Sequence, residues 1–275
     1  MSKRQPSAAP QPVDAPAPTL AESPSLVGRV VVVTGASRGI GRVIALACAE
    51  AGADVAITYR TSAQGAAEVA AAVTALGRGA QVLQVDTGNP RDVERLARDA
   101  HAAFGRIDVW INNAGVDVLT GSTARAPRLE KLDLLLAVDL RGTILASWAA
   151  VELMRGQASG GVILNMSWDH VLTGGMKGEY AQMFCAAKGG VYSFSRALAH
   201  AVAPHIRVNV LGPGWVETAY GAGLDPAIKE RITASIPLGR WGTPADVAHA
   251  AVYLASDAAA YVTGQMLSIN GGAVV

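Results

Sequence analysis

The sequence has little cysteine and little net charge, and both shortages narrow the class of protein. Its two cysteines, Cys48 and Cys185, lie in apolar, helix-like runs. This excludes a disulfide framework and offers no metal-ligand spacing, so no metal site is predicted and a reducing compartment is expected. With 23 basic and 22 acidic residues the net charge is +1, which excludes the electrostatic footprint of a protein that binds nucleic acid or an anionic membrane. A small-molecule substrate is the expected partner.

Long apolar runs are also lacking. No segment reaches the roughly 18 uninterrupted apolar residues of a membrane span. The first 25 residues, MSKRQPSAAPQPVDAPAPTLAESPS, hold six of the 13 prolines and no apolar run after the basic start, which excludes a secretory signal. We therefore predict a disordered Pro/Ala-rich tail over residues 1–26, a single domain over 27–275, and a cytoplasmic location.

Short β-branched runs alternate with alanine- and leucine-rich runs from residue 28 onward. The pattern predicts seven strands, at 29–35, 54–60, 80–86, 107–113, 161–167, 206–212 and 265–271. It predicts helices at 39–51, 63–76, 90–104, 128–155, 181–203 and 244–255, and no regular structure over 213–243. Continuously apolar strands separated by helices indicate an α/β, Rossmann-like, doubly wound parallel sheet covered on both faces. Ligands bind such sheets at the carboxyl ends of the strands.

A glycine-rich turn follows the first predicted strand. The stretch TGASRGIGR places Gly35, Gly39 and Gly41 where the next helix opens. Glycine serves many tight turns for conformational reasons alone, but its position between a first strand and an alanine-rich helix favours a dinucleotide site, whose pyrophosphate lies at the helix amino terminus.

The end of the second strand indicates which dinucleotide is bound. An acidic residue there would hold the ribose hydroxyls of NAD, whereas ITYRTS presents Arg60 instead. Together with Arg38, this guanidinium suits a 2′-phosphate. NADP(H) is therefore the predicted cofactor, the alternative being that both arginines are solvated surface residues.

Six motifs occur in register: TGASRGIG, VDTGNP, INNAG, AAKGGV, VLGPGWVET and YVTGQMLSINGG. With them the sequence resembles the classical short-chain dehydrogenase/reductase family over almost everything after residue 27. The resemblance implies that cofactor contacts come, from the pyrophosphate to the nicotinamide, from Gly35, Ser37, Arg38, Gly39, Ile40, Asp86, Thr87, Asn112, Ala114, Gly115, Pro213, Gly214, Val216 and Thr218. It also implies that Lys188 binds the nicotinamide ribose.

The catalytic pattern of that family is incomplete in this sequence. Classical members use asparagine, serine, tyrosine and lysine, and the tyrosine hydroxyl gives a proton as hydride arrives. Lys188 matches the lysine. Asp139 stands at the asparagine position, Ser167 and Trp168 at the usual serine pair, and Phe184 at the tyrosine.

Several interpretations follow from this gap. A substitute acid would come from Asp139, Asp169, His170 or Tyr180, with Ser167 as a hydrogen-bond donor. Against this, Asp169 and His170 suit a solvated loop, Tyr180 suits packing, and Asp139 suits a structural pair with Lys188. The predicted function is an NADP(H)-dependent oxidoreductase that reduces a conjugated C=C, C=N or carbonyl group. The alternatives are a cofactor-binding protein with redox-neutral or no activity and, least favoured because the glycine turn is complete, an interaction protein without cofactor.

The remaining features concern the substrate and the assembly. The segment 213–243 resembles the family's substrate-binding lid. Trp168, Trp215, Tyr220 and Trp241 indicate an apolar pocket lined by aromatic rings, although Trp241 equally suits packing of the lid. In the resembling family, helices corresponding to 128–155 and 181–203 pair across a two-fold axis, which implies a homodimer or homotetramer.

Overall fold

Seven parallel strands form one sheet in the computed structural model, which describes residues 24–175 and 178–275, without the side chains of residues 122, 179, 219 and 220. The predicted tail over 1–26 lies almost entirely outside the described residues. The strands are β1(Val30–Val33), β2(Asp54–Tyr59), β3(Ala80–Gln84), β4(Val109–Asn112), β5(Gly161–Met166), β6(Ile206–Pro213) and β7(Met266–Ile269). Their order, β3-β2-β1-β4-β5-β6-β7, confirms the predicted doubly wound sheet.

The main helices also begin and end near their predicted positions. They are α1(Gly39–Glu50), α2(Ala63–Ala75), α3(Pro90–Phe104), α4(Arg128–Leu134), α5(Thr143–Arg155), α6(Glu179–Val202) and α9(Pro244–Ala255). The single helix predicted over 128–155 is one helical run, but its middle, η2(Leu135–Gly142), is π-helical. Short helical turns occur at η1(Gly121–Arg125), η3(Asp169–Leu172) and η4(Asp257–Ala259).

The prediction of no regular structure over 213–243 was wrong in part. The segment forms two short helices, α7(Ala219–Ala222) and α8(Pro226–Ala234). Helix α8 begins at an Asp-Pro pair, where the Asp225 carboxylate accepts a hydrogen bond from the Ala227 N–H at 2.8 Å. None of the residues of α8 is buried, so the helix has no apolar face for a periodicity argument to detect.

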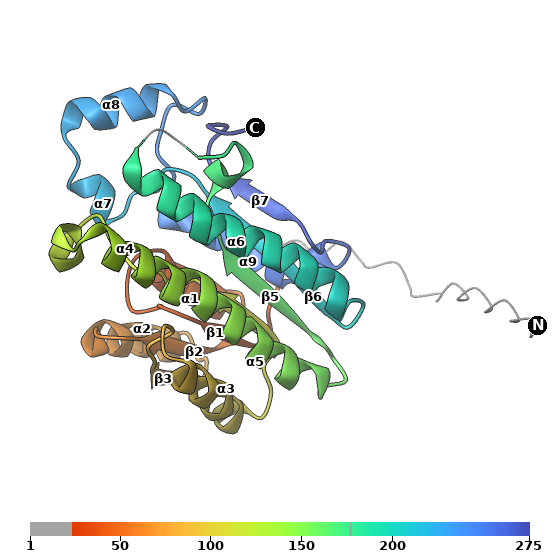
Figure 1. The fold of residues 1–275 in the computed structure, drawn as a ribbon. Helices are drawn as coiled ribbons and strands as arrows, with labels where there is room; N and C mark the ends of the chain where they lie inside the picture. The colour runs from red at the N-terminus through yellow and green to blue at the C-terminus, as the bar shows by residue number, and fades with distance from the viewer. Residues whose placement is uncertain (1–23, 176–177) are drawn as a thin grey trace, which may run out of the picture.

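Each strand of the centre contributes to two cores because successive side chains point to opposite faces. In β1, Val31 and Val33 pack with α1, α2 and α9, whereas Val30 and Val32 pack with α3, α5 and α6. Figure 1 shows the α4–η2–α5 run and α6 lying side by side over one face of the sheet. This double burial explains the continuous apolar strands.

The helical run Arg128–Arg155 is long and apolar enough, by length and composition alone, to cross a membrane. Half of its most apolar window is buried inside the molecule. Its buried residues, including Ala146, Ala150 and Met154, pack against the sheet. A core helix passes the same test as a membrane span, so its apolar composition is accounted for by that packing.

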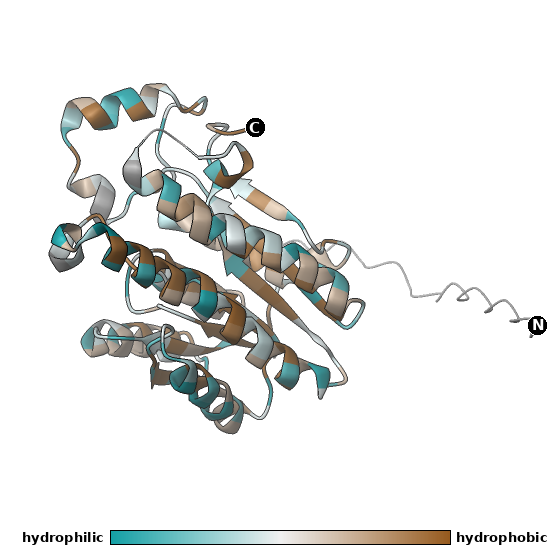
Figure 2. Cartoon of the chain, viewed as in Figure 1, coloured by the Kyte–Doolittle hydropathy of each residue, from teal (hydrophilic) through white to brown (hydrophobic). Residues whose placement is uncertain are grey.

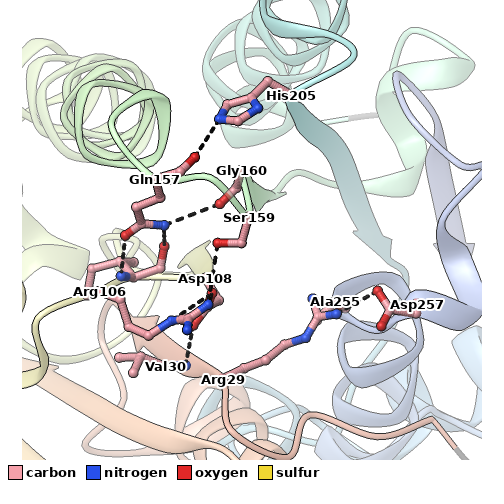
Figure 3. A network of polar contacts seen from close by, with 11 residues as sticks. Arg29, Val30, Arg106, Asp108, Gln157, Ser159, Gly160, His205, Ala255 and Asp257 are labelled. Carbon is pink, nitrogen blue, oxygen red and sulfur yellow. Dashed lines mark hydrogen bonds and ion pairs between the residues drawn. The ribbon is translucent and has the colours of Figure 1, made fainter.

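A polar network joins the amino ends of the strands, at the edge opposite the ligand-binding edge (Figure 3). The buried Asp108 carboxylate accepts the Val30 N–H at 2.9 Å and pairs with Arg106 at 2.5 Å. The hydrogen bond between Arg106 and Asp108 and the negative charge of that carboxylate raise the pKa of the Arg106 guanidinium. Gln157 bonds both the N–H and the C=O of Ile107 at 2.8 Å. These contacts anchor β1 and β4, so the loops at their carboxyl ends extend from a fixed base.

Candidate active site

The glycine turn between β1 and α1 leaves the helix amino terminus open. Gly35 and Gly39 have φ of +66° and +58°, a left-handed conformation that favours glycine. A Cβ at Gly41 would lie 2.4 Å from the Gly35 carbonyl oxygen, so the turn tolerates no larger residue there. Arg38, at the N-cap, makes no side-chain capping bond, so the first N–H groups of α1 remain available for an anion. The turn thus fits a dinucleotide pyrophosphate, with Ser37 beside it.

The two arginines predicted to hold a 2′-phosphate lie on neighbouring segments. Arg38 follows β1 and Arg60 follows β2, strands that pair directly, and both residues are exposed. Near Arg38 lies Asp117, in the loop after β4. Burial raises the pKa of Asp117, but hydrogen bonds from Thr120 and backbone N–H groups, with a smaller contribution from Arg38, bring it below its ordinary value. Both arginines therefore lie near the carboxyl ends of β1 and β2, and their exposure fits the alternative of solvated surface residues as well as the predicted phosphate site.

Two predicted adenine contacts lie in the loop between β3 and α3. The Asp86 carboxylate accepts the Gly88 N–H at 2.9 Å, and the Asp86 N–H donates to the Asp92 carboxylate at 3.0 Å. Thr87 is buried next to them. A Cβ at Gly142 would lie 2.5 Å from the Thr87 carbonyl oxygen, so η2 packs directly on this loop. These hydrogen bonds and this packing hold the loop in one conformation.

Residues at the end of β4 and just after it hold the sheet and the glycine turn together. The Asn112 side chain is buried and bonds Trp110, Ser147 and Asn165 at 2.8–3.0 Å, which orients it into the sheet. Its neighbour Asn113, which the sequence analysis did not single out, donates to the Thr34 carbonyl oxygen at 2.9 Å. The two consecutive asparagines of INNAG are the sequence feature that could have pointed to this role of Asn113.

Ala114 and Gly115 complete this segment beside the turn and the catalytic region. The Ala114 N–H donates to the Thr34 hydroxyl at 3.0 Å. A Cβ on Gly35 would lie 3.0 Å from the Ala114 Cα, and one on Gly115 would lie 3.1 Å from the Asp139 carboxylate. The loops after β1 and β4 therefore touch, and Gly115 brings the second loop close to the Asp139 carboxylate.

Lys188 and Asp139 form a buried ion pair. Lys188 Nζ lies 2.9 Å from Asp139 Oδ2, and the side chains are 10% and 2% exposed. Nζ also donates to the Met166 carbonyl oxygen at 3.3 Å, while the second carboxylate oxygen accepts the Val116 N–H at 2.9 Å. The pair therefore joins α6, η2, β5 and the loop after β4. The ammonium is held in one place at the carboxyl ends of the strands.

The proton of Ser167 is used within the protein. Ser167 Oγ donates to the carbonyl oxygen of Lys188 at 2.8 Å, and the residue is buried. This bond ties the end of β5 to α6. In this conformation the hydroxyl proton is directed at the backbone of α6.

Asp169 and His170 form a pair behind the wall of the site. The fully buried Asp169 carboxylate lies 2.7 Å from His170 Nδ1 and accepts the Asn270 amide at 3.1 Å. The His170 ring stacks on Trp168 with centroids 4.7 Å apart and meets Trp215 edge-on at 6.3 Å. Neither member of the pair is among the described residues that line the adjacent cavity. The interpretation as a solvated loop is wrong, since Asp169 is 0% exposed and connects β5 to the loop after β7.

A cavity of about 400 Å³ opens at the carboxyl ends of the strands. Aromatic rings dominate its wall: Trp168 meets Phe184 edge-on with centroids 6.3 Å apart, and Trp215 lies 5.2 Å from Trp241. Trp241 is 5% exposed, packs against Trp215 and lines the cavity. The predicted site residues that line it are Ile40, Ser167, Tyr180, Lys188, Pro213, Gly214, Val216 and Thr218. The side chain of Tyr220 lies outside the described residues.

Tyr180 has a buried partner that the sequence analysis missed. Lys131, on α4, is 2% exposed, and its Nζ lies 3.0 Å from the Tyr180 hydroxyl. In the sequence, RLEKLDLLL has the pattern of an ordinary amphipathic helix, so nothing marks this lysine.

Among the described residues no cluster of three or more His, Cys, Asp or Glu that could hold a metal ion occurs.

Known proteins share both sequence and fold with this chain. The family model described as "Enoyl-(Acyl carrier protein) reductase" matches residues 35–274. The chain is 34% identical over 250 residues to 3beta-hydroxysteroid dehydrogenase 1 of Eggerthella lenta, covering 90% of this chain and 94% of that protein. It is 37% identical over 253 residues to L-rhamnose 1-dehydrogenase (NAD(P)(+)) of a Sphingomonas strain, covering 91% and 98%. Among solved structures, a short-chain dehydrogenase from Burkholderia cenocepacia in complex with NADP superimposes with a TM-score of 0.81 at 33% identity, covering 90% and 98%.

Proposed function

The chain belongs to the short-chain dehydrogenase/reductase family, and on that premise we propose that it is an NADP(H)-dependent oxidoreductase with an atypical active site. Its substrate is small and apolar and presents a conjugated C=C, a C=N or a carbonyl group. The proton comes from a residue other than the one at position 184, because the Phe184 ring has no proton to give.

One observation carries this proposal: a fixed ammonium at the base of an apolar cavity beside a fitting dinucleotide turn. Lys188 Nζ is held at 2.9 Å by Asp139 and lines the cavity together with Ile40 of α1. The cavity volume of about 400 Å³ lies in the range of small-ligand sites. A bound NADPH supplies the hydride. The residues of the chain bind it, orient the substrate and exclude water.

The choice of NADP(H) is supported from two directions. The chain ends β2 with Arg60 and places Arg38 on the neighbouring turn, so cations stand where an NAD site has a carboxylate. The Burkholderia relative was crystallised with NADP. We expect Arg60→Ala to weaken NADPH binding about 10- to 100-fold and to leave NADH binding nearly unchanged, which a fluorescence titration measures.

The wall of the cavity supports the apolar substrate. Trp168, Phe184, Trp215 and Trp241 bring aromatic faces to one space, which favours flat or conjugated molecules over sugars. The named relatives act on a steroid and on L-rhamnose, so family membership does not choose between these substrate classes. The aromatic wall is therefore the basis for the choice.

The decisive experiment is NADPH oxidation over a panel of ketones, conjugated enones and imines. It compares the unaltered protein with Phe184→Tyr, which restores a hydroxyl, and with Phe184→Leu, which changes the ring alone. Turnover by the unaltered protein supports the proposal. No turnover by the unaltered protein on any probe, with ketone reduction appearing only in Phe184→Tyr, contradicts it.

That second result would favour the alternative, a cofactor-binding protein with redox-neutral or no activity. A specific observation speaks for it: Ser167 donates its proton to the backbone and Asp139 is engaged by Lys188. Loss of a positioned acid costs about 10² to 10⁴ in rate. The alternative predicts that NADPH binds with ordinary affinity while every probe stays unreduced.

The assembly is a further part of the proposal. Trp148 on α5 is 53% exposed and meets Phe194 of α6 edge-on at 6.4 Å. Figure 2 shows apolar residues along the α4–η2–α5 run and α6, and those that face the sheet are part of the core. The exposed ring of Trp148 therefore supports a homodimer or homotetramer formed through α5 and α6. Trp148→Glu should shift the protein to a smaller mass in sedimentation analysis. The two free cysteines support a cytoplasmic location.

A further inference from the structure

The side chain of Lys131 is buried, and it has no carboxylate partner among the residues whose side chains the structure describes. It is 2% exposed, and among the side chains that the structure describes no carboxylate lies within 4.0 Å of its Nζ. Nζ donates to the Ala124 carbonyl oxygen at 2.6 Å and to the Tyr180 hydroxyl at 3.0 Å, and it lies 4.3 Å from the centre of the tyrosine ring. A cation removed from water without an opposite charge is costly. An anion that forms beside the Lys131 ammonium during a reaction would offset this cost.

Among the described residues that contact Lys131, Tyr180 has a group that can become such an anion. Its hydroxyl accepts the lysine N–H, and its own proton has no acceptor among the described residues. Tyr180 is 36% exposed and lines the cavity. Its proton is therefore available to a ligand or to solvent.

The other predicted acids are less suited to proton donation. Asp139 is paired with Lys188 at 2.9 Å, and Ser167 donates to the backbone at 2.8 Å. Asp169 and His170 bind each other behind Trp168. Of the candidates, Tyr180 lines the cavity and keeps a hydroxyl proton that has no acceptor among the described residues.

We propose that Tyr180 is the proton donor of this site and that Lys131 is the cation that stabilises the phenolate left behind. The inference rests on the proposed reductase function. As a substrate carbon accepts hydride, its π electron pair shifts toward the substrate's oxygen or nitrogen. That atom takes the Tyr180 proton, and the O–H bond of tyrosine breaks. The phenolate carries the negative charge beside the Lys131 ammonium until it regains a proton from solvent.

The position of Tyr180 also indicates which substrate suits this donor. It precedes Lys188 by eight residues, so their backbones are about 12 Å apart along α6. The proton is delivered further from Lys188 than a residue at position 184 would deliver it. This favours a conjugated enone over a simple ketone, because the oxygen of an enone lies several bonds from the carbon that accepts hydride. The first product is then an enol, which tautomerises to the saturated ketone.

The test uses three variants of the full chain. Tyr180→Phe keeps the ring and removes the hydroxyl, Lys131→Met keeps the length and removes the charge, and Lys131→Arg keeps the charge. With the best enone of the panel, we expect kcat to fall about 10²- to 10⁴-fold in Tyr180→Phe. We expect a fall of about 10- to 100-fold in Lys131→Met and partial recovery in Lys131→Arg.

Two further measurements distinguish a purely structural role of Lys131 from stabilisation of the Tyr180 phenolate. In Lys131→Met the solvent deuterium isotope effect on kcat should rise, because proton transfer becomes slower, while the Kd of NADPH stays unchanged. A fall in kcat with no isotope effect and no recovery in Lys131→Arg overturns the role of Lys131.

Failure of this inference differs from failure of the function beneath it. Unchanged kcat in both Tyr180→Phe and Lys131→Met, with the unaltered protein active, overturns the proton donor and leaves the reductase proposal standing. No turnover by the unaltered protein overturns both.

Discussion

The buried pair of Lys188 and Asp139 allows a quantitative test of the site's architecture. Asp139→Asn removes the negative charge and keeps an oxygen for the Val116 N–H, which now bonds Oδ1 at 2.9 Å. Among the described residues, the partner that remains for the Lys188 ammonium, 10% exposed, is the Met166 carbonyl oxygen at 3.3 Å. Breaking a buried ion pair by removing one partner costs about 3–5 kcal/mol. At about 2–4 °C per kcal/mol, the midpoint of thermal unfolding falls by about 6–20 °C.

The complementary change, Lys188→Met, leaves a carboxylate without its cation and should cost a similar free energy. In the double variant neither charge remains. We therefore expect the double variant to be more stable than the sum of the single effects predicts, by at least about 2 kcal/mol. Urea unfolding of all four proteins, without cofactor and at one protomer concentration, measures this coupling.

A surface pair provides the matched control. Arg155 and Glu152 lie 3.5 Å apart with 55% and 77% of their side chains exposed. A cycle of Glu152→Gln and Arg155→Met should show coupling below about 0.5 kcal/mol. If Asp139 and Lys188 couple as weakly as this control, the two groups are not paired and the account of a fixed ammonium is wrong.

Three further predictions follow from single groups. Gly41→Ala places a Cβ 2.4 Å from the Gly35 carbonyl oxygen, so NADPH affinity should fall at least about 10-fold in a fluorescence titration, and unchanged affinity would contradict the proposed turn. Burial raises the pKa of the Cys48 thiol to about 12, so iodoacetamide should label Cys48 only after unfolding, as intact-mass spectrometry would show. The hydrogen bond from Arg240 is the main cause that holds the pKa of Asp246 well below its usual range. The stabilising effect of this hydrogen bond is complete above the ordinary carboxyl pKa and is lost as pH falls from there toward the lowered pKa of the folded protein. The difference in stability between the unaltered protein and Asp246→Asn should therefore narrow as pH falls below about 4.

The fold was readable from the sequence because burial on both faces leaves a strong pattern. A strand such as VVVV at Val30–Val33 must be apolar throughout to serve two cores, and the helices between such strands carry one apolar face. Helix α8 shows the limit of this reasoning: with no buried residue it has no pattern, and only its Asp225 cap marks it. Local capping chemistry is a weaker signal than periodicity.

The candidate active site also has features that the sequence made recognisable and features that it did not. Lys188, the glycine turn and the chain of motifs were recognisable because each depends on residue type at short spacing. The contact between Tyr180 and Lys131 joins residues 49 positions apart, and no spacing rule connects α4 with the start of α6. Asp169 and His170, adjacent in sequence, were open to several roles until packing placed them behind Trp168.

Local residue patterns were enough to predict the doubly wound sheet, the glycine-rich turn proposed to bind the dinucleotide and the lack of a hydroxyl at position 184. These properties follow from local composition and periodicity, which every segment carries independently of the rest. Which proton-bearing side chains face the cavity and which are engaged elsewhere became known from the folded arrangement alone. That arrangement depends on packing between distant segments, because a hydroxyl or carboxylate is available to a substrate only when no neighbouring group of the fold has already taken its hydrogen bond.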